Sequence, residues 1–207
     1  MKLLLVNASP HKKGSTARAL DECRAKLKEL GAMTEYYHLG NAARNSCTGC
    51  GGCKGSGTCV FGDIDALADA FTRADGIIIG VPTHYAGAPG NILSALSRLL
   101  FSRRQCVEYK PIAVIGSGRR GCITGAIGDV QKFFEFASCP IISGVYPALI
   151  YGSDYESAGF DAEGLQNMRS VAENMYWILS ALELAEKNGI SHPISEPKIK
   201  TDIPSLL

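Results

Sequence analysis

A bare apolar run leads into a turn rich in glycine and hydroxyl groups in the segment Leu3-Leu4-Leu5-Val6-Asn7-Ala8-Ser9-Pro10-His11-Lys12-Lys13-Gly14-Ser15-Thr16-Ala17. Because the run does not alternate with polar residues, it predicts a strand covered on both faces, as in a parallel sheet. A turn of this kind that leads into a helix presents free backbone N–H groups to an anion. The alternative is that Ser15 or Thr16 only caps the helix.

The turn lacks the Lys-Ser or Lys-Thr pair of a Walker motif, which argues against a nucleoside triphosphate with magnesium. We therefore expect a single terminal phosphate, such as that of FMN, to bind at this turn. The residues expected around it are Ser9, Gly14, Ser15, Thr16 and Ala17.

Further apolar segments recur along the chain. Segments 77–81, 112–115 and 141–145 predict buried strands, and the more polar segment 34–39 predicts an edge strand. Between them, apolar residues recur at helical spacing around 20–30, 64–71, 92–100, 123–137 and 161–187. Five strands alternating with five helices imply a doubly wound α/β fold of three layers (α/β/α), and the strand number favours the flavodoxin-like parallel order 2-1-3-4-5.

The composition fits one globular domain. The chain has 207 residues, an ordinary 46% of them hydrophobic, and a formal net charge of +1. The near-neutral charge argues against nucleic acid or an anionic membrane as a partner, and no apolar run is long enough to span a bilayer. We expect a cytoplasmic protein with one domain over residues 1–188, a cysteine loop at 45–62 and an extended C-terminal arm at 189–207.

Two more loops follow predicted strands at the same edge of the sheet. The loop Pro82-Thr83-His84-Tyr85-Ala86-Gly87 combines a stiff turn, small residues that let the backbone approach a flat ring, and aromatic rings that could lie against it. The fourth strand ends in Gly116-Ser117-Gly118. Because ligands bind where this strand order reverses, both loops are expected to surround a flavin. An ordinary connection with a surface tyrosine is the alternative.

Four of the eight cysteines gather in one glycine-rich segment, at Cys47, Cys50, Cys53 and Cys59. Zinc usually takes two Cys-x-x-Cys pairs separated by a longer span, so this spacing suits one iron–sulfur cluster better. Zinc, or thiols without a metal, stay open as alternatives. The other cysteines are scattered and are predicted to be small buried hydrophobic residues: Cys23, Cys106, Cys122 and Cys139.

Taken together, these segments resemble the NADPH-dependent FMN reductase branch of the flavodoxin-like superfamily. The resemblance is carried by Ala8-Ser9-Pro10 with Gly14-Ser15-Thr16, by Val81-Pro82-Thr83-His84-Tyr85 with Gly87, and by Gly116-Ser117-Gly118. The cysteine run resembles the compact motif of the iron-sulfur flavoproteins of anaerobes.

This resemblance implies that FMN binds at the carboxyl ends of the strands. Its phosphate would be held by Ser9, Ser15 and Thr16, and its ring would be lined by Pro82, Thr83, Tyr85, Gly87, Ser117 and Gly118. The resemblance also implies a [4Fe–4S] cluster on Cys47, Cys50, Cys53 and Cys59. Subunits would form a homodimer or tetramer in which a cluster approaches the flavin of a neighbour.

We therefore expect an FMN-dependent oxidoreductase. Electrons would pass between NAD(P)H or a ferredoxin, the cluster and FMN to a quinone, an oxygen species or a protein acceptor. Because the flavin carries the chemistry, no side chain is predicted to act as a catalytic acid or base. The alternatives are a cluster-free NAD(P)H:FMN or quinone reductase, and a non-enzymatic electron carrier or zinc-stabilised interaction module.

Overall fold

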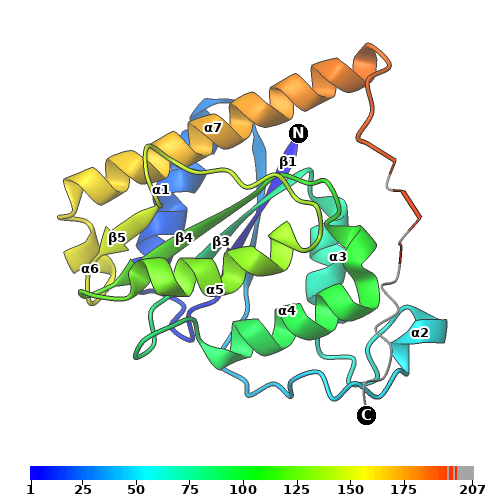
Figure 1. The fold of residues 1–207 in the computed structure, drawn as a ribbon. Helices are drawn as coiled ribbons and strands as arrows, with labels where there is room; N and C mark the ends of the chain where they lie inside the picture. The colour runs from blue at the N-terminus through cyan, green and yellow to red at the C-terminus, as the bar shows by residue number, and fades with distance from the viewer. Residues whose placement is uncertain (195, 198, 200–207) are drawn as a thin grey trace.

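The structure is a computed structural model that describes residues 1–194, 196–197 and 199. Its centre is one parallel sheet of five strands in the order β2-β1-β3-β4-β5 (Figure 1). This confirms the predicted fold class and strand order. The strands are β1 (Lys2–Asn7), β2 (Met33–His38), β3 (Gly76–Pro82), β4 (Ile112–Gly118) and β5 (Leu149–Tyr151).

Helices cover both faces of the sheet, so alternate residues of the central strands enter different cores. On one face, Leu3, Leu5 and Ile78 pack with α1 (Ser15–Glu29) and α7 (Ala162–Lys187). On the other face, Leu4 and Ile77 pack with α3 (Asp65–Arg73), α4 (Gly90–Arg103) and α5 (Ile123–Glu135). Burial on both sides explains why these strands lack polar alternation.

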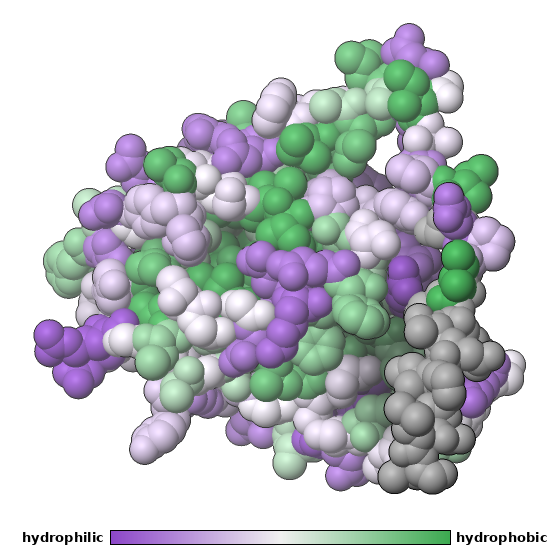
Figure 2. All heavy atoms as spheres, viewed as in Figure 1, coloured by the Kyte–Doolittle hydropathy of each residue, from purple (hydrophilic) through white to green (hydrophobic). Residues whose placement is uncertain are grey.

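Three short helices lie in the connections. They are α2 (Cys53–Ser56), η1 (Arg104–Cys106) and α6 (Tyr155–Ala158). No helix in the described part of the chain combines the length and the apolar character needed to cross a bilayer. On the face seen in Figure 2, hydrophilic side chains surround an apolar area below α7 in the middle of the view, and further apolar side chains gather near the end of α7. Leu184 and Ile190 are among the exposed apolar residues there.

The prediction of a strand at 141–145 is wrong, because the fifth strand lies at Leu149–Tyr151. Ile141 makes only an isolated bridge to Ile112. Beyond it, the Asn167 Oδ1 atom accepts the Val145 N–H at 3.0 Å, and the Asn174 Nδ2 atom donates to the Ser143 carbonyl oxygen at 2.8 Å. Side chains of α7 thus take the backbone hydrogen bonds that a strand partner would have made.

One scattered cysteine was also misjudged. Cys23, Cys106 and Cys139 are buried as predicted, and burial raises the pKa of the Cys106 thiol to about 11. Cys122 is exposed, and it takes a left-handed conformation (φ 63°) directly before α5. The predicted arm at 189–207 lies partly outside the described residues. Within them, the His192 ring stacks on Tyr109, with 4.5 Å between the ring centroids.

The contact between β4 and α5 depends on a glycine. A Cβ atom on Gly116 would lie 2.5 Å from Ile123 Cγ2 and 2.8 Å from Ile127 Cγ1. Gly128 lies on the same helix, and a Cβ atom there would meet no described atom within 4 Å. Substitution of alanine for Gly116 or for Gly128 therefore places the same methyl group in different surroundings.

We expect Gly116→Ala to lower the free energy of unfolding by about 1–3 kcal/mol, because the added methyl group overpacks the contact. Gly128→Ala should raise it by about 0.5–1 kcal/mol, because alanine is the better helix former. Urea unfolding followed by circular dichroism measures both. Equal effects of the two substitutions would contradict the close packing of β4 against α5.

Candidate flavin site and cysteine loop

The first turn of α1 is open at its N-terminus. Gly14 is the N-cap residue, and no described side chain accepts a hydrogen bond from the first N–H groups of the helix. The first turn of α1 also has no acidic residue to neutralise the positive end of the helix dipole. Ser15 and Thr16 follow the cap position, which removes the alternative that either one caps the helix. The N–H groups are therefore available to an anion.

Polar side chains at the ends of β1 and β2 shape the loop that precedes this turn. The Asn7 Oδ1 atom accepts the Ser9 N–H at 2.9 Å, and the Ser9 Oγ atom accepts the His11 N–H at 3.2 Å. The His38 Nε2 atom donates to the Ser9 carbonyl oxygen at 2.9 Å. Neither Asn7 nor His38 was among the predicted site residues. A polar residue that closes an apolar strand was the available signal for Asn7.

A buried hydrogen bond joins α1 to β4 across β3. The hydroxyl oxygens of Thr16 and Ser117 are 2.7 Å apart, and both residues are buried. Thr16 can pass over β3 only because residue 80 is glycine: a Cβ atom on Gly80 would lie 2.7 Å from Thr16 Cγ2. The bond therefore holds the turn after β1 at a fixed place beside the loop that follows Ser117.

The loop after β3 forms a tight turn at the same edge. Thr83 donates its N–H to the Ser117 carbonyl oxygen at 2.8 Å, and His84 and Gly87 exchange backbone hydrogen bonds of 2.9 and 3.3 Å. Tyr85 lies between them in a left-handed conformation (φ 59°), and its side chain is fully exposed. Ala86 is also exposed, so the tip of this turn is available to a ligand or to a neighbouring chain.

Thr83 has an unsatisfied polar atom in this crevice. Its Oγ1 atom is buried and has no hydrogen-bond partner among the described residues. A Cβ atom on Gly118 would lie 3.3 Å from this oxygen, so the missing side chain leaves access to it. A buried hydroxyl without a partner is costly, and a polar atom of a ligand would satisfy it. The crevice therefore fits a flavin that carries polar groups on its ring.

Asp129 of α5 supports the turn after β3 by a hydrogen bond to its backbone. Its Oδ2 atom accepts the Ala88 N–H at 3.1 Å, and this hydrogen bond keeps the pKa of the carboxyl below its usual value. A Cβ atom on Gly87 would lie 2.6 Å from the same oxygen, so the approach requires glycine there. The sequence carried no signal for Asp129, because it lies more than forty positions from the turn it supports.

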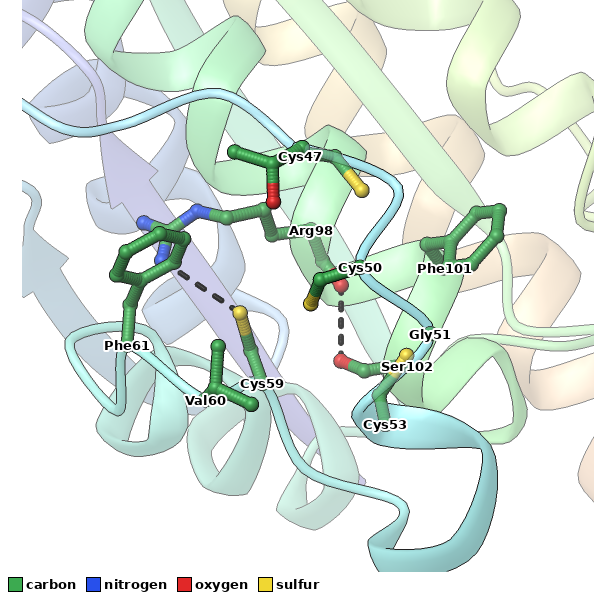
Figure 3. A pocket seen from close by; sticks show the side chains of 11 residues that line it. Cys47, Cys50, Gly51, Cys53, Cys59, Val60, Phe61, Arg98, Phe101 and Ser102 are labelled. Atoms are coloured by element: carbon green, nitrogen blue, oxygen red, sulfur yellow. Dashed lines mark hydrogen bonds between the residues drawn. The ribbon is translucent and has the colours of Figure 1, made fainter.

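The four cysteines of the loop line one hollow against the second half of α4. Figure 3 shows Cys47, Cys50, Cys53 and Cys59 arranged around this hollow, which Arg98, Phe61, Phe101 and Ser102 help to line. Four glycines of the loop have left-handed backbone conformations, at Gly49, Gly51, Gly57 and Gly62. Such conformations are open to glycine at little cost, which allows the loop to wrap around a group.

The donor set fits an iron–sulfur cluster better than a single metal ion. No three cysteine, histidine or acidic side chains converge on one point closely enough to hold an ion, within the part of the chain that the structure describes. Each of the four thiolates of a four-iron cluster binds a different iron atom, so such a cluster needs its ligands around a hollow and not at a point. The lining of this hollow meets that requirement in residue type and number.

The predicted flavin residues and the four cysteines of the loop lie near different ends of α4. The helix begins at Gly90, beside the turn after β3, and the cysteine hollow contacts it at Arg98, Phe101 and Ser102. Arg98 lies eight positions after Gly90, which corresponds to about 12 Å along a helix at 1.5 Å per residue. The structure thus gathers the predicted flavin residues at the carboxyl edge and the predicted metal ligands in a second, separate place.

The strand order defines a flavodoxin-like fold, and the open turn after β1 provides an anion site at the edge where this fold binds ligands. The sequence profile of the NADPH-dependent FMN reductases matches residues 1–152, and the chain belongs to this family. It is an FMN-dependent oxidoreductase.

Individual relatives agree with this assignment. The chain is 28% identical over 158 residues to an iron-sulfur flavoprotein of Methanocaldococcus jannaschii, covering 73% of this chain and 81% of that protein. It is 25% identical over 195 residues to an iron-sulfur flavoprotein of Archaeoglobus fulgidus, covering 87% and 96%. A flavodoxin of Streptococcus pneumoniae shares the fold, with a TM-score of 0.58, 16% identity and coverage of 86% of this chain and 99% of that one.

A carboxylate at the start of α1 provides a test of the phosphate turn. Ser15→Asp should stabilise the ligand-free protein by about 0.3–1 kcal/mol, because a negative charge interacts favourably with the helix N-terminus. The same charge should weaken FMN binding roughly tenfold or more by repelling the phosphate. Thermal unfolding and fluorescence titration measure the two effects. Ser15→Asn is the uncharged control, and unchanged FMN affinity in Ser15→Asp would place the phosphate elsewhere.

Removing the Asp129 carboxylate should loosen the turn after β3. A hydrogen bond to a charged group contributes about 1.5–3 kcal/mol, less where water has access, so Asp129→Ala should speed hydrogen exchange of the Ala88 amide roughly tenfold. Since the pKa of Asp129 is lowered in the folded protein, the wild-type contribution is complete above the ordinary pKa and disappears as the pH falls through the lowered one. Lys132→Ala removes the ion-pair partner of Asp129 and serves as the control. An Ala88 amide that exchanges equally in both variants would contradict this role.

Proposed function

We propose that this chain is an FMN-dependent oxidoreductase of the iron-sulfur flavoprotein type. Its Cys47, Cys50, Cys53 and Cys59 side chains would bind a [4Fe–4S] cluster, and electrons would pass between NAD(P)H or a ferredoxin, this cluster and FMN. The final acceptor would be a quinone, an oxygen species or a protein. The observation that carries the proposal is the arrangement of four thiols around one hollow in a chain of the FMN reductase family. The relatives named iron-sulfur flavoproteins support it.

The residues at the carboxyl edge would bind and orient the flavin. The open N-terminus of α1 would hold the phosphate, with Ser15 beside it. Thr16 and Ser117 would keep this turn in place, and the unsatisfied Thr83 hydroxyl would hydrogen-bond to a polar atom of the ring. FMN, when bound, supplies hydride and single-electron exchange, whereas an iron–sulfur cluster supplies single electrons only.

The assembly we propose is a homodimer or a tetramer. The cysteine hollow and the flavin edge lie along α4, separated by roughly 12 Å of helix by its rise per residue. The rim of the hollow carries exposed apolar side chains, Val60, Phe61 and Phe101, which water solvates poorly. A neighbouring subunit, or a ferredoxin, would cover this rim and bring its own flavin or cluster to the cysteines. The thiol ligands would operate in the reducing cytoplasm.

Anaerobic analysis of iron, acid-labile sulfide and flavin tests the proposal. The purified wild-type protein should contain about four iron and four sulfide per chain together with one FMN, as a single cluster with four cysteine ligands requires. Cys50→Ser should abolish iron binding while FMN content stays unchanged, because the two sites are separate. Cys122→Ser is the matched control, an exposed cysteine outside the loop that should keep the iron.

The outcomes separate the proposal from its alternatives. Flavin without iron in the wild-type protein would indicate a cluster-free NAD(P)H:FMN or quinone reductase. Iron that survives in Cys50→Ser would contradict the assigned ligands, and flavin lost together with iron would contradict two separate sites. A colourless protein that contains zinc would overturn both redox functions.

A further inference from the structure

Arg98 is a buried charge at the base of the cysteine hollow. It lies on α4 and is only 2% exposed. Its Nη1 and Nη2 atoms donate to the two carboxylate oxygens of Asp63 at 2.5 and 2.8 Å, and Nη1 also lies 3.7 Å from the Cys59 sulfur (Figure 3). The Phe61 ring packs over the guanidinium, 5.2 Å from its carbon atom to the ring centroid. A single guanidinium thus connects the fourth cysteine to a carboxylate.

The charges around this guanidinium do not cancel. Arg44 also approaches Asp63, with its Nε atom 3.6 Å from Oδ2, so two guanidinium groups share one carboxylate. The side chain of Asp63 is 40% exposed, whereas that of Arg98 is almost fully buried. Water therefore screens the negative charge more than the positive charge that faces Cys59. The Cys59 side of the hollow carries a net positive potential.

Arg98 also keeps an unused donor. Its Nε atom is buried and has no hydrogen-bond partner among the described residues. A buried N–H without a partner costs free energy, and an arginine held in place by Asp63 and Phe61 cannot turn to find one. Because Arg98 lines the hollow, an anionic group bound there would offset part of the cost of burying this cation.

We infer that Arg98 sets the reduction potential of the cluster that Cys59 helps to bind. The inference rests on the proposed function, since it concerns the group held in the hollow. Net charge and hydrogen bonds to the sulfur atoms are among the factors that fix the potential of an iron–sulfur cluster. A cation at the Cys59 sulfur stabilises the form that has accepted an electron, and Asp63 moderates this effect while it orients Arg98. Arg98 therefore raises the potential, and Asp63 lowers it.

Two substitutions in the same ion pair should consequently shift the potential in opposite directions. In Arg98→Gln the ratio of reduced to oxidised cluster at a fixed ambient potential should fall roughly tenfold, which is 59 mV for a one-electron couple. In Asp63→Asn the ratio should rise, because Arg98 keeps its charge and loses its counterion. Arg103→Gln is the control: it removes a charge from the same helix, but its partners are Asp65, Asp69 and the Gly57 carbonyl oxygen.

The measurement is an anaerobic redox titration of the purified holoproteins, followed by electron paramagnetic resonance, with iron and sulfide determined on each sample. Opposite shifts in the two variants and little shift in the control support the inference. Shifts in the same direction, or none, would show that the ion pair is only structural. If Arg98→Gln loses its cluster, the test rests on Asp63→Asn. A raised cluster potential in that variant supports the inference, and a lowered or unchanged potential contradicts it. A wild-type protein with FMN and no iron would overturn the cluster and this inference together, whereas unshifted potentials in intact clusters would overturn the inference alone.

Discussion

Burial of both sheet faces restricts where this chain can bind a ligand. Helices α1 and α7 cover one face and α3, α4 and α5 cover the other, so the backbone is accessible at the carboxyl edge, where the strand order reverses between β1 and β3. The Thr16–Ser117 hydrogen bond depends on this arrangement, because it crosses β3 at a glycine. It fixes the turn after β1 against the loop after β4, and the position of the proposed flavin follows from it.

Helix α4 links the turn after β3 to the cysteine hollow. Its first residue follows the turn that Asp129 supports, and its second half forms the base of the cysteine hollow. Both places combine a glycine-rich loop with a carboxylate that holds it: Asp129 for the turn after β3, and Asp63 for the cysteine loop through Arg98. Asp129 lies 41 positions from Ala88 in the turn it supports, whereas Asp63 directly follows the cysteine loop and acts through Arg98, which lies 35 positions away.

Much of the fold could be predicted because fully buried strands have a strong sequence signal. The runs at 3–6, 77–81 and 112–115 all lie in central strands. The run at 141–145 is also mostly apolar, but it contains Ser143, and side chains of Asn167 and Asn174 bind its backbone in place of a strand partner. The importance of Arg98 could not be predicted either, because it too depends on residues far away in the sequence. Its importance comes from Asp63 and Cys59, which lie 35 and 39 positions away, and no local pattern reports such pairs.

The central claim is that FMN binds where the loops after β1, β3 and β4 meet, apart from the cysteine hollow. Hydrogen exchange of the protein with and without FMN tests this claim most directly, because it maps protection along the whole chain. We expect FMN to protect amides within 8–17, 82–88 and 116–122 and to leave those within 47–59 unchanged. Protection confined to the cysteine loop, or to the opposite edge of the sheet around 108–111, would contradict it.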